Sequence, residues 1–146
     1  MKDVHSHMLA TQVIGAVVLA ADNTPAAIDL QGYNAAEILL SIGIGGITFD
    51  ATNKIEFKLT HSDDDVTYTA VDVDDMIGLS SVGGGGIIKS LVAEHAAAAM
   101  YRCGYKGGKR YLKILADFSG THGTGTPIAV AVLKMKGADT PEVDQE

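Results

Sequence analysis

The stretch KIEFKLT, residues 54–60, decides the fold class of this chain. Its apolar residues Ile55, Phe57 and Leu59 alternate strictly with charged or polar residues. A period of two is the pattern of a β-strand that buries one face and exposes the other. The aspartates of HSDDD follow at once, at residues 61–65, and are typical of a turn. This stretch therefore predicts a strand that ends in a turn.

The next segment, TYTAV at residues 67–71, brings the chain back as the second strand of a hairpin. Similar short segments of alternating or apolar residues, separated by turn residues, occur along the rest of the chain. The further strands that we expect are residues 11–21, 27–30, 37–44, 86–91, 101–105, 111–118 and 127–136.

Many short strands with little helix predict an all-β fold: an antiparallel β-sandwich, jelly-roll-like, with about eight strands. Residues 11–136 form this domain, residues 1–10 an extended N-terminal arm, and residues 137–146 an acidic flexible tail. The segment 92–100 is rich in alanine, which favours helix, but it is so short that we expect a turn or a single helical turn. The core that alternation predicts includes Ile38, Leu40, Ile42, Ile55, Phe57, Leu59, Leu112, Ile114, Phe118, Val130 and Val132.

The composition restricts the function. A net charge of -7 opposes binding to nucleic acid or to an anionic membrane surface. The only cysteine, Cys103, excludes an internal disulfide and a zinc site built from cysteines. No apolar run reaches the roughly 18 residues of a membrane span. Residues 8–21 resemble the apolar part of a signal peptide, but Gln12 interrupts them, so we expect a strand buried on both faces.

Two motifs invite a ligand-binding interpretation. The run VGGGGIIKS, residues 82–90, resembles a phosphate-binding loop, but Ile88 stands where that motif needs glycine before the lysine. We expect a turn there. His61 and the aspartates of residues 63–65, with those of residues 72–75, could hold a divalent cation such as calcium, yet their spacing fits no EF-hand loop. Solvated turns are the simpler interpretation, and we expect no cofactor.

Two further groups contain histidines. In FSGTHGTGTP, residues 118–127, Ser119 and His122 could form a nucleophilic pair, but nothing in the spacing brings a carboxylate to the imidazole. We therefore expect a protein without enzymatic activity. His5 and His7 could share a metal only with a third ligand. We expect them to lie in an arm that crosses a neighbouring subunit and becomes ordered on assembly.

The segment YKGGKRYLK, residues 105–113, combines Lys106, Lys109 and Arg110 with two tyrosines. Such a mixture can bind single-stranded nucleic acid by stacking. Because the chain as a whole is acidic, a contact with carboxylates of a partner protein or of a second copy is the better interpretation. His5, His7, Lys106, Lys109 and Arg110 are thus our candidates for protein contacts.

Taken together, AAIDLQGYNAAEILLSIG, GITFDATNKIEFKLTHSDDDVTYTAV and YRCGYKGGKRYLKILADFSGTHGTGTPIAV resemble small structural proteins of tailed bacteriophages, most closely the capsid decoration, or cement, proteins of jelly-roll type. The resemblance covers roughly residues 10–136. It departs from the usual pattern at Asp65, where such hairpins commonly carry glycine. Aspartate tolerates the left-handed conformation, so the turn is expected to survive.

The resemblance implies a non-enzymatic virion protein, made in the host cytoplasm, that sits on the outer capsid surface and stabilises the shell. It implies contacts with the major capsid protein and a homo-oligomer, either a dimer or a trimer. Two alternatives stay open: another phage component, such as a head–tail connector or tail protein, and a carbohydrate-binding β-sandwich. The second is disfavoured because the chain has no tryptophan to serve as a sugar platform.

Overall fold

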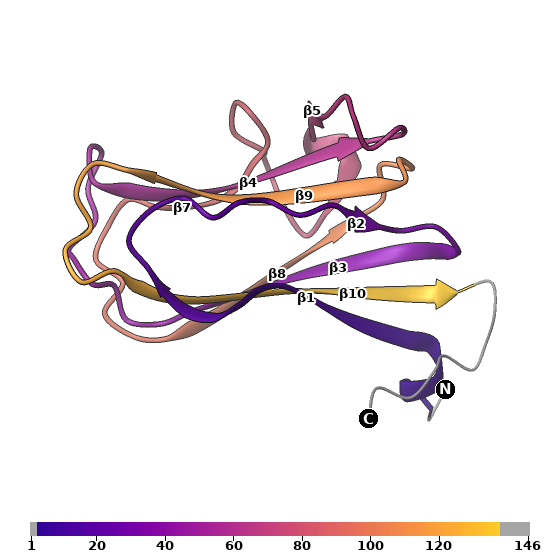
Figure 1. Ribbon diagram of the computed structural model, residues 1–146, viewed down its shortest axis with the longest axis horizontal. Coiled ribbons are helices and arrows are strands. Elements are labelled where there is room, and N and C mark those ends of the chain that lie inside the picture. The colour runs from indigo at the N-terminus through magenta and orange to yellow at the C-terminus, as the bar shows by residue number, and fades with distance from the viewer. Residues whose placement is uncertain (1–2, 138–146) are drawn as a thin grey trace.

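The computed structural model describes residues 3–137, which form two antiparallel β-sheets packed face to face (Figure 1). Every strand pairs antiparallel to its neighbours, and these residues contain two 3-10 turns but no α-helix. The strands are β1 (Met8–Leu19), β2 (Ile28–Asp29), β3 (Tyr33–Ile42), β4 (Lys54–Ser62), β5 (Thr69–Ala70), β6 (Met76–Ile77), β7 (Ile87–Leu91), β8 (Ala99–Tyr105), β9 (Tyr111–Ser119) and β10 (Thr126–Gly137), and the 3-10 turns are η1 (His5–His7) and η2 (Val73–Asp75).

The strand order is that of a jelly roll. One sheet runs β1-β10-β3-β8-β6, and the other runs β2-β9-β4, with β5 and β7 both paired to β4. Without the two-residue strands β5 and β6, the order is β1-β10-β3-β8 over β2-β9-β4-β7. The chain then changes sheet at every connection except β4 to β7. Such crossing between two sheets is the double Greek key of jelly-roll proteins, so the predicted fold class is confirmed.

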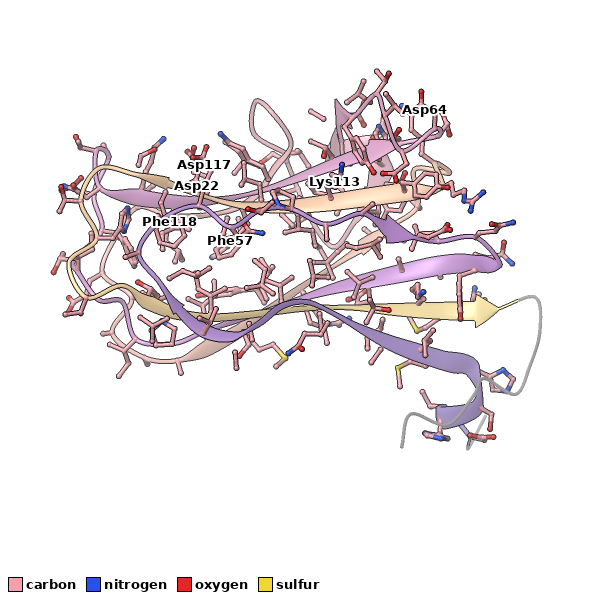
Figure 2. All side chains as sticks on the ribbon, in the orientation of Figure 1. Asp22, Phe57, Asp64, Lys113, Asp117 and Phe118 are labelled. Carbon is pink, nitrogen blue, oxygen red and sulfur yellow. The ribbon has the colours of Figure 1, made fainter. Side chains whose placement is uncertain are left out.

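The core lies between the sheets, as alternation predicted. In β4 the residues Ile55, Phe57 and Leu59 are fully buried, and each such side chain contributes on the order of 1.5–3 kcal/mol by leaving water. Every predicted core residue is buried except Phe118, which is partly buried and packs against the core. Figure 2 shows Phe57 and Phe118 pointing into the space between the sheets.

The N-terminal boundary differs from the prediction. Residues 8–10 do not belong to an extended arm, because β1 begins at Met8 and Met8 pairs with Met135 of β10. His5 and His7 lie in η1 rather than in extended chain. The predicted strand of residues 11–21 is not buried on both faces either, because β1 is an edge strand and its residues 15–18 are exposed.

Three other expectations can be compared with the structure. β3 ends at Ile42, so Ile44 leaves the alternating face and is 61% exposed. The alanine-rich segment 92–98 contains no helix; its His95 donates from Nδ1 to the carbonyl oxygen of Gly43, 2.8 Å away, which ties the segment to the end of β3. Asp65 adopts a φ of 59°, the left-handed conformation expected of it. The predicted acidic tail lies outside the described residues, apart from Gly137.

Candidate functional site

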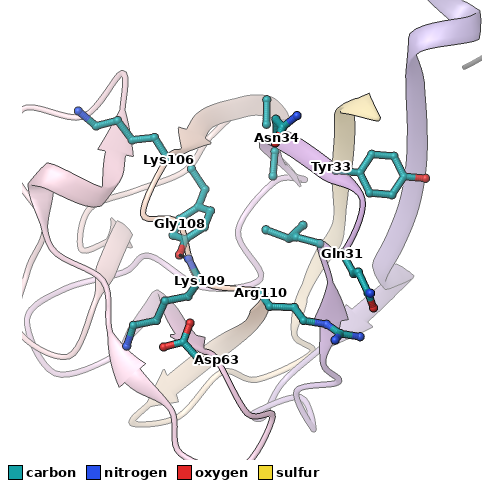
Figure 3. A pocket seen from close by; sticks show the side chains of 12 residues that line it. Gln31, Tyr33, Asn34, Asp63, Lys106, Gly108, Lys109 and Arg110 are labelled. Atoms are coloured by element: carbon teal, nitrogen blue, oxygen red, sulfur yellow. Dashed lines mark hydrogen bonds between the residues drawn. The ribbon is translucent and has the colours of Figure 1, made fainter. Parts of the chain in front are cut away.

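A pocket of about 370 Å³ opens at the end of the sandwich where the β2–β3 and β8–β9 connections meet (Figure 3). Its polar lining comes from three parts of the chain. Gln31 and Asn34 flank the start of β3, Asp63 follows β4, and Lys106, Lys109 and Arg110 come from the β8–β9 loop. The fold thus brings the three predicted basic residues together with polar residues that are distant in sequence. We call this site the basic pocket.

The three basic side chains have different surroundings, and Figure 3 shows them spreading from their loop in different directions. Arg110 is paired with Asp29 through two hydrogen bonds, Nε to Oδ1 at 2.9 Å and Nη2 to Oδ2 at 2.7 Å. These hydrogen bonds lower the pKa of the Asp29 carboxyl and raise the pKa of Arg110. The charge of Arg110 is therefore largely balanced within the chain.

The two lysines lack such a partner. Lys109 donates from Nζ to the hydroxyl oxygen of Thr69 at 3.0 Å, which is a neutral acceptor. Lys106 is exposed, and its backbone N–H donates to the carbonyl oxygen of Asp75 at 2.8 Å. Among residues 3–137, neither ammonium group forms an ion pair with a carboxylate. Within the described residues, the basic pocket therefore presents two lysine ammonium groups without an ion-pair partner, with the Asp63 carboxylate also in its lining.

A buried hydrogen-bond chain supports the loop that carries these lysines. The Lys109 backbone N–H donates to the Tyr105 hydroxyl at 3.1 Å, and that hydroxyl lies 2.9 Å from Nδ1 of His61. Both Tyr105 and His61 are buried. Burial lowers the pKa of His61 despite Asp75 nearby, and it raises the pKa of Tyr105 to about 12. Neutral His61 thus accepts from Tyr105, which fixes the position of the loop.

His61 was interpreted from the sequence only as a possible cation ligand. The alternation that buries Leu59 continues by two residues to His61, so the pattern already placed this ring inside the sandwich. Its partner Tyr105 gave no comparable signal, because their pairing joins β4 to the end of β8. His5 and His7, the other predicted contact residues, lie in η1 and are not among the residues that line the basic pocket.

The glycine run forms a tight turn whose first and last amides are engaged within the chain. The Gly83 N–H donates to the carbonyl of Ile87 at 3.0 Å, and the Gly86 N–H donates to the carbonyl of Gly83 at 3.1 Å. The Gly86 carbonyl accepts from the Leu59 N–H of β4 at 2.8 Å. These groups are used within the chain, so the run serves to fold β7 back onto β4.

The remaining motifs hold the chain together locally. Asp64 accepts from the backbone N–H groups of Val66 and Thr67 and from the Ser62 hydroxyl, and these hydrogen bonds lower its pKa to about 2. His122 is buried, and its Nε2 donates to the backbone carbonyl of Ser119 at 2.8 Å. No group of three or more potential metal ligands occurs among the described residues.

The outer faces of the two sheets differ strongly in charge. On the β4–β9 side, Lys54 pairs with Glu56 at 2.6 Å and Lys58 pairs with Asp117, and Figure 2 shows Lys113 and Asp117 on this side. On the β1-β10-β3-β8 side there are two shallow hollows, of about 410 Å³ and 280 Å³, and no charged residue lines either one. We call this second surface the uncharged face; its central residues are Leu39, Ser41, Met100, Ala129 and Ala131.

The uncharged face has a signal in the sequence of β10, which was not among the predicted site residues. Core residues Val130 and Val132 alternate there with Ala129, Ala131 and Leu133, where the equivalent outward positions of β4 are charged. A strand with apolar residues on both faces is typical of one that is covered on both sides.

The chain matches no known family model, no curated protein and no solved structure. No helix within residues 3–137 is long and apolar enough to cross a bilayer.

Proposed function

We propose that this chain is a non-enzymatic structural protein that attaches to the outside of a bacteriophage capsid and stabilises the shell, as the resemblance to decoration proteins implies. The basic pocket carries the proposal. An acidic chain places Lys106 and Lys109, without carboxylate partners among residues 3–137, around a pocket of about 370 Å³ at one end of the sandwich. This arrangement suits a contact with a carboxylate of the major capsid protein.

Stabilisation follows from mass action. A protein that binds the assembled shell but not the free capsid subunits shifts the equilibrium towards the shell. Each copy needs to contribute only a few kcal/mol, because many copies act on one particle. We also infer that the protein is a homo-oligomer, a dimer or a trimer, since an oligomer holds several pockets against one shell and gains avidity from it.

The N-terminal arm that we propose to contact the capsid is shorter than the arm that the sequence predicted. Because Met8 belongs to β1, residues 8–10 are not part of an arm. His5 and His7 remain candidate contacts at that end of the chain. Removal of residues 1–7 leaves the strand pairing of β1 untouched and tests their part in attachment.

The experiment that tests the proposal is stripping and re-addition. Phage particles are stripped of this protein, and DNA release on heating is measured before and after the purified protein is added back. We expect stripped particles to release DNA at lower temperature and added protein to restore the original value. Equal release temperatures for stripped and decorated particles contradict the stabilising role. Protein that does not rebind to stripped particles indicates another virion component, such as a connector or tail protein.

The basic pocket is tested in the same assay with two double variants. Lys106→Ala with Lys109→Ala removes the two unpaired charges, while Lys54→Ala with Lys58→Ala changes the net charge equally on the charged outer face of β4. We expect only the pocket variant to lose affinity for stripped particles. Binding of the wild type should also weaken with added salt, because exposed charges are screened within about 8 Å at physiological ionic strength. Equal binding of the two variants contradicts the assignment of the pocket.

A further inference from the structure

We infer that the uncharged face is the surface through which two copies of this chain pack against each other, across a two-fold axis. The inference rests on the proposed self-association and names the surface and symmetry that produce it. It does not depend on the capsid as the final target, because the contact forms between isolated copies.

The uncharged face is apolar and exposed. Apart from Gln12, its hollows are lined by small or apolar side chains, and Met100 of β8 is 66% exposed. At the edge strand β1, Val17 and Val18 are 45% and 56% exposed. Apart from η1 near the end of β10, no described helix or strand lies over this side of the sheet (Figure 1). A contiguous apolar patch of this kind on a soluble protein marks an interaction site.

The charge of the chain indicates that a second copy occupies the uncharged face. Each chain carries a net charge of -7, so two copies repel unless they meet where charges are absent. The uncharged face is such a surface, and it directs the charged outer face of the other sheet away from the partner. A partner of opposite charge would instead be expected to bind a charged surface.

The area of the uncharged face is also suited to a dimer interface. Four neighbouring strands, about 4.8 Å apart and about ten residues long, present about 600 Å² before the relief of the side chains is counted. Stable complexes bury about 800 Å² on each partner, so the face is of the right order for a dimer. The small residues Ala129 and Ala131 lie in the middle of it and let two sheets approach to about 10 Å.

A charged pair adjoins the apolar centre of the face. Arg102, which is opposite Leu39 in the sheet, forms an ion pair with Glu37 at 3.1 Å, and its side chain is 78% exposed. An apolar centre with a polar, solvated rim is the usual anatomy of a protein interface. Arg102 and Glu37 are therefore the charged groups that adjoin the apolar centre of the face.

The test is sedimentation of the purified full chain over a range of concentrations. Leu39→Glu places a charge in the centre of the face and opposite Arg102. Leu115→Glu is the matched control, since Leu115 is an outward, half-buried leucine of the other sheet and lies opposite Lys58. Met100→Glu is a second variant whose exposed side chain leaves the core untouched. Circular dichroism verifies that all of them fold.

We expect the wild type and Leu115→Glu to be dimers. Leu39→Glu and Met100→Glu should each raise the dimer dissociation constant at least about tenfold, because every dimer must bury the new charge twice. A wild type that is a monomer at every concentration contradicts self-association itself. A dimer that survives both face variants contradicts this surface alone, and a trimer contradicts the two-fold axis. If the wild type is a monomer and the face variants lose binding to phage particles, the face contacts the capsid protein instead.

Discussion

The hydroxyl of Tyr105 lies 2.9 Å from Nδ1 of His61, and this contact joins the end of β8 to the buried end of β4. The same hydroxyl accepts the backbone N–H of Lys109, so one oxygen connects the interior of the sandwich to the wall of the basic pocket. A side chain at Gly107 would crowd this hydroxyl, because a Cβ there would come within 2.8 Å of the Tyr105 oxygen. The buried contact between Tyr105 and His61 thus fixes the position of the loop that forms one wall of the basic pocket.

Replacement of Tyr105 by phenylalanine should destabilise the protein. The change leaves the ring in place but deprives buried His61 and the Lys109 N–H of their partner. A buried polar group without a partner costs about 1–3 kcal/mol. Urea unfolding should show this loss. Tyr101→Phe is the control, since its hydroxyl contacts His95 at a half-buried site, and a loss as large as that of Tyr105→Phe would disprove the special role of the buried pair.

The stability should depend on pH through His61. Burial lowers the pKa of His61 below its ordinary value of 6.5, so below pH 6.5 the unfolded chain binds a proton that the folded chain does not yet bind. Stability is therefore complete above pH 6.5 and declines as the pH falls from 6.5 towards the lower folded pKa. Urea unfolding between pH 8 and pH 5 measures this decline.

His61→Gln should remove that part of the pH dependence, because glutamine does not titrate. His7→Gln, at the partly exposed turn η1, is the control and should retain the decline. An unaltered slope in His61→Gln would show that another group is responsible.

Gly86 should not tolerate a side chain. Its φ is +83°, and a Cβ at this position would lie 2.2 Å from the carbonyl oxygen of Leu59. Gly86→Ala must both adopt a strained conformation and displace β4, which should cost at least about 2 kcal/mol. Gly84 lies in the same run, with open space around it and no positive φ, so Gly84→Ala should change stability by less than about 0.5 kcal/mol. Chemical denaturation of both variants gives the comparison; equal effects would rule out the turn geometry as the cause.

Asp64 should govern the order of the β4–β5 turn. Asp64→Ala removes the acceptor for the amides of Val66 and Thr67, whose hydrogen exchange should become faster. In the wild type the stabilisation that these hydrogen bonds give should decline in acid, as the pH falls from 3.8 towards the folded pKa of about 2, because the opened turn binds a proton first. NMR hydrogen exchange measures both effects. Asp74→Ala, in the neighbouring turn η2, should leave these two amides unchanged; if it accelerates them equally, the assignment to Asp64 is wrong.

Alternation placed the core correctly because burial of one strand face depends only on residues two positions apart, as in Ile55, Phe57 and Leu59. The start of β1 at Met8 could not be found in this way, since it depends on pairing with Met135 at the other end of the chain. Local propensity likewise overestimated helix near His95, where a hydrogen bond to Gly43 decides the conformation.

The candidate site was predicted only in part. The three basic residues of the β8–β9 loop are adjacent in the sequence, so their clustering was visible, but their pocket requires Gln31 and Asn34 from the start of β3. The uncharged face needs four strands side by side, and alternation within one strand does not reveal what its outward neighbours are.

The place of β10 between β1 and β3 also determines when this protein can fold as it leaves the ribosome. β1 and β3 are made early, yet neither has its main partner until residues 126–137 have been synthesised. Until then their apolar strands remain available to wrong partners, which is the hazard of sheets built from distant segments. A nascent chain that stops after β9 should therefore be recognised by chaperones and proteases as unfolded, although most of its strands are already present.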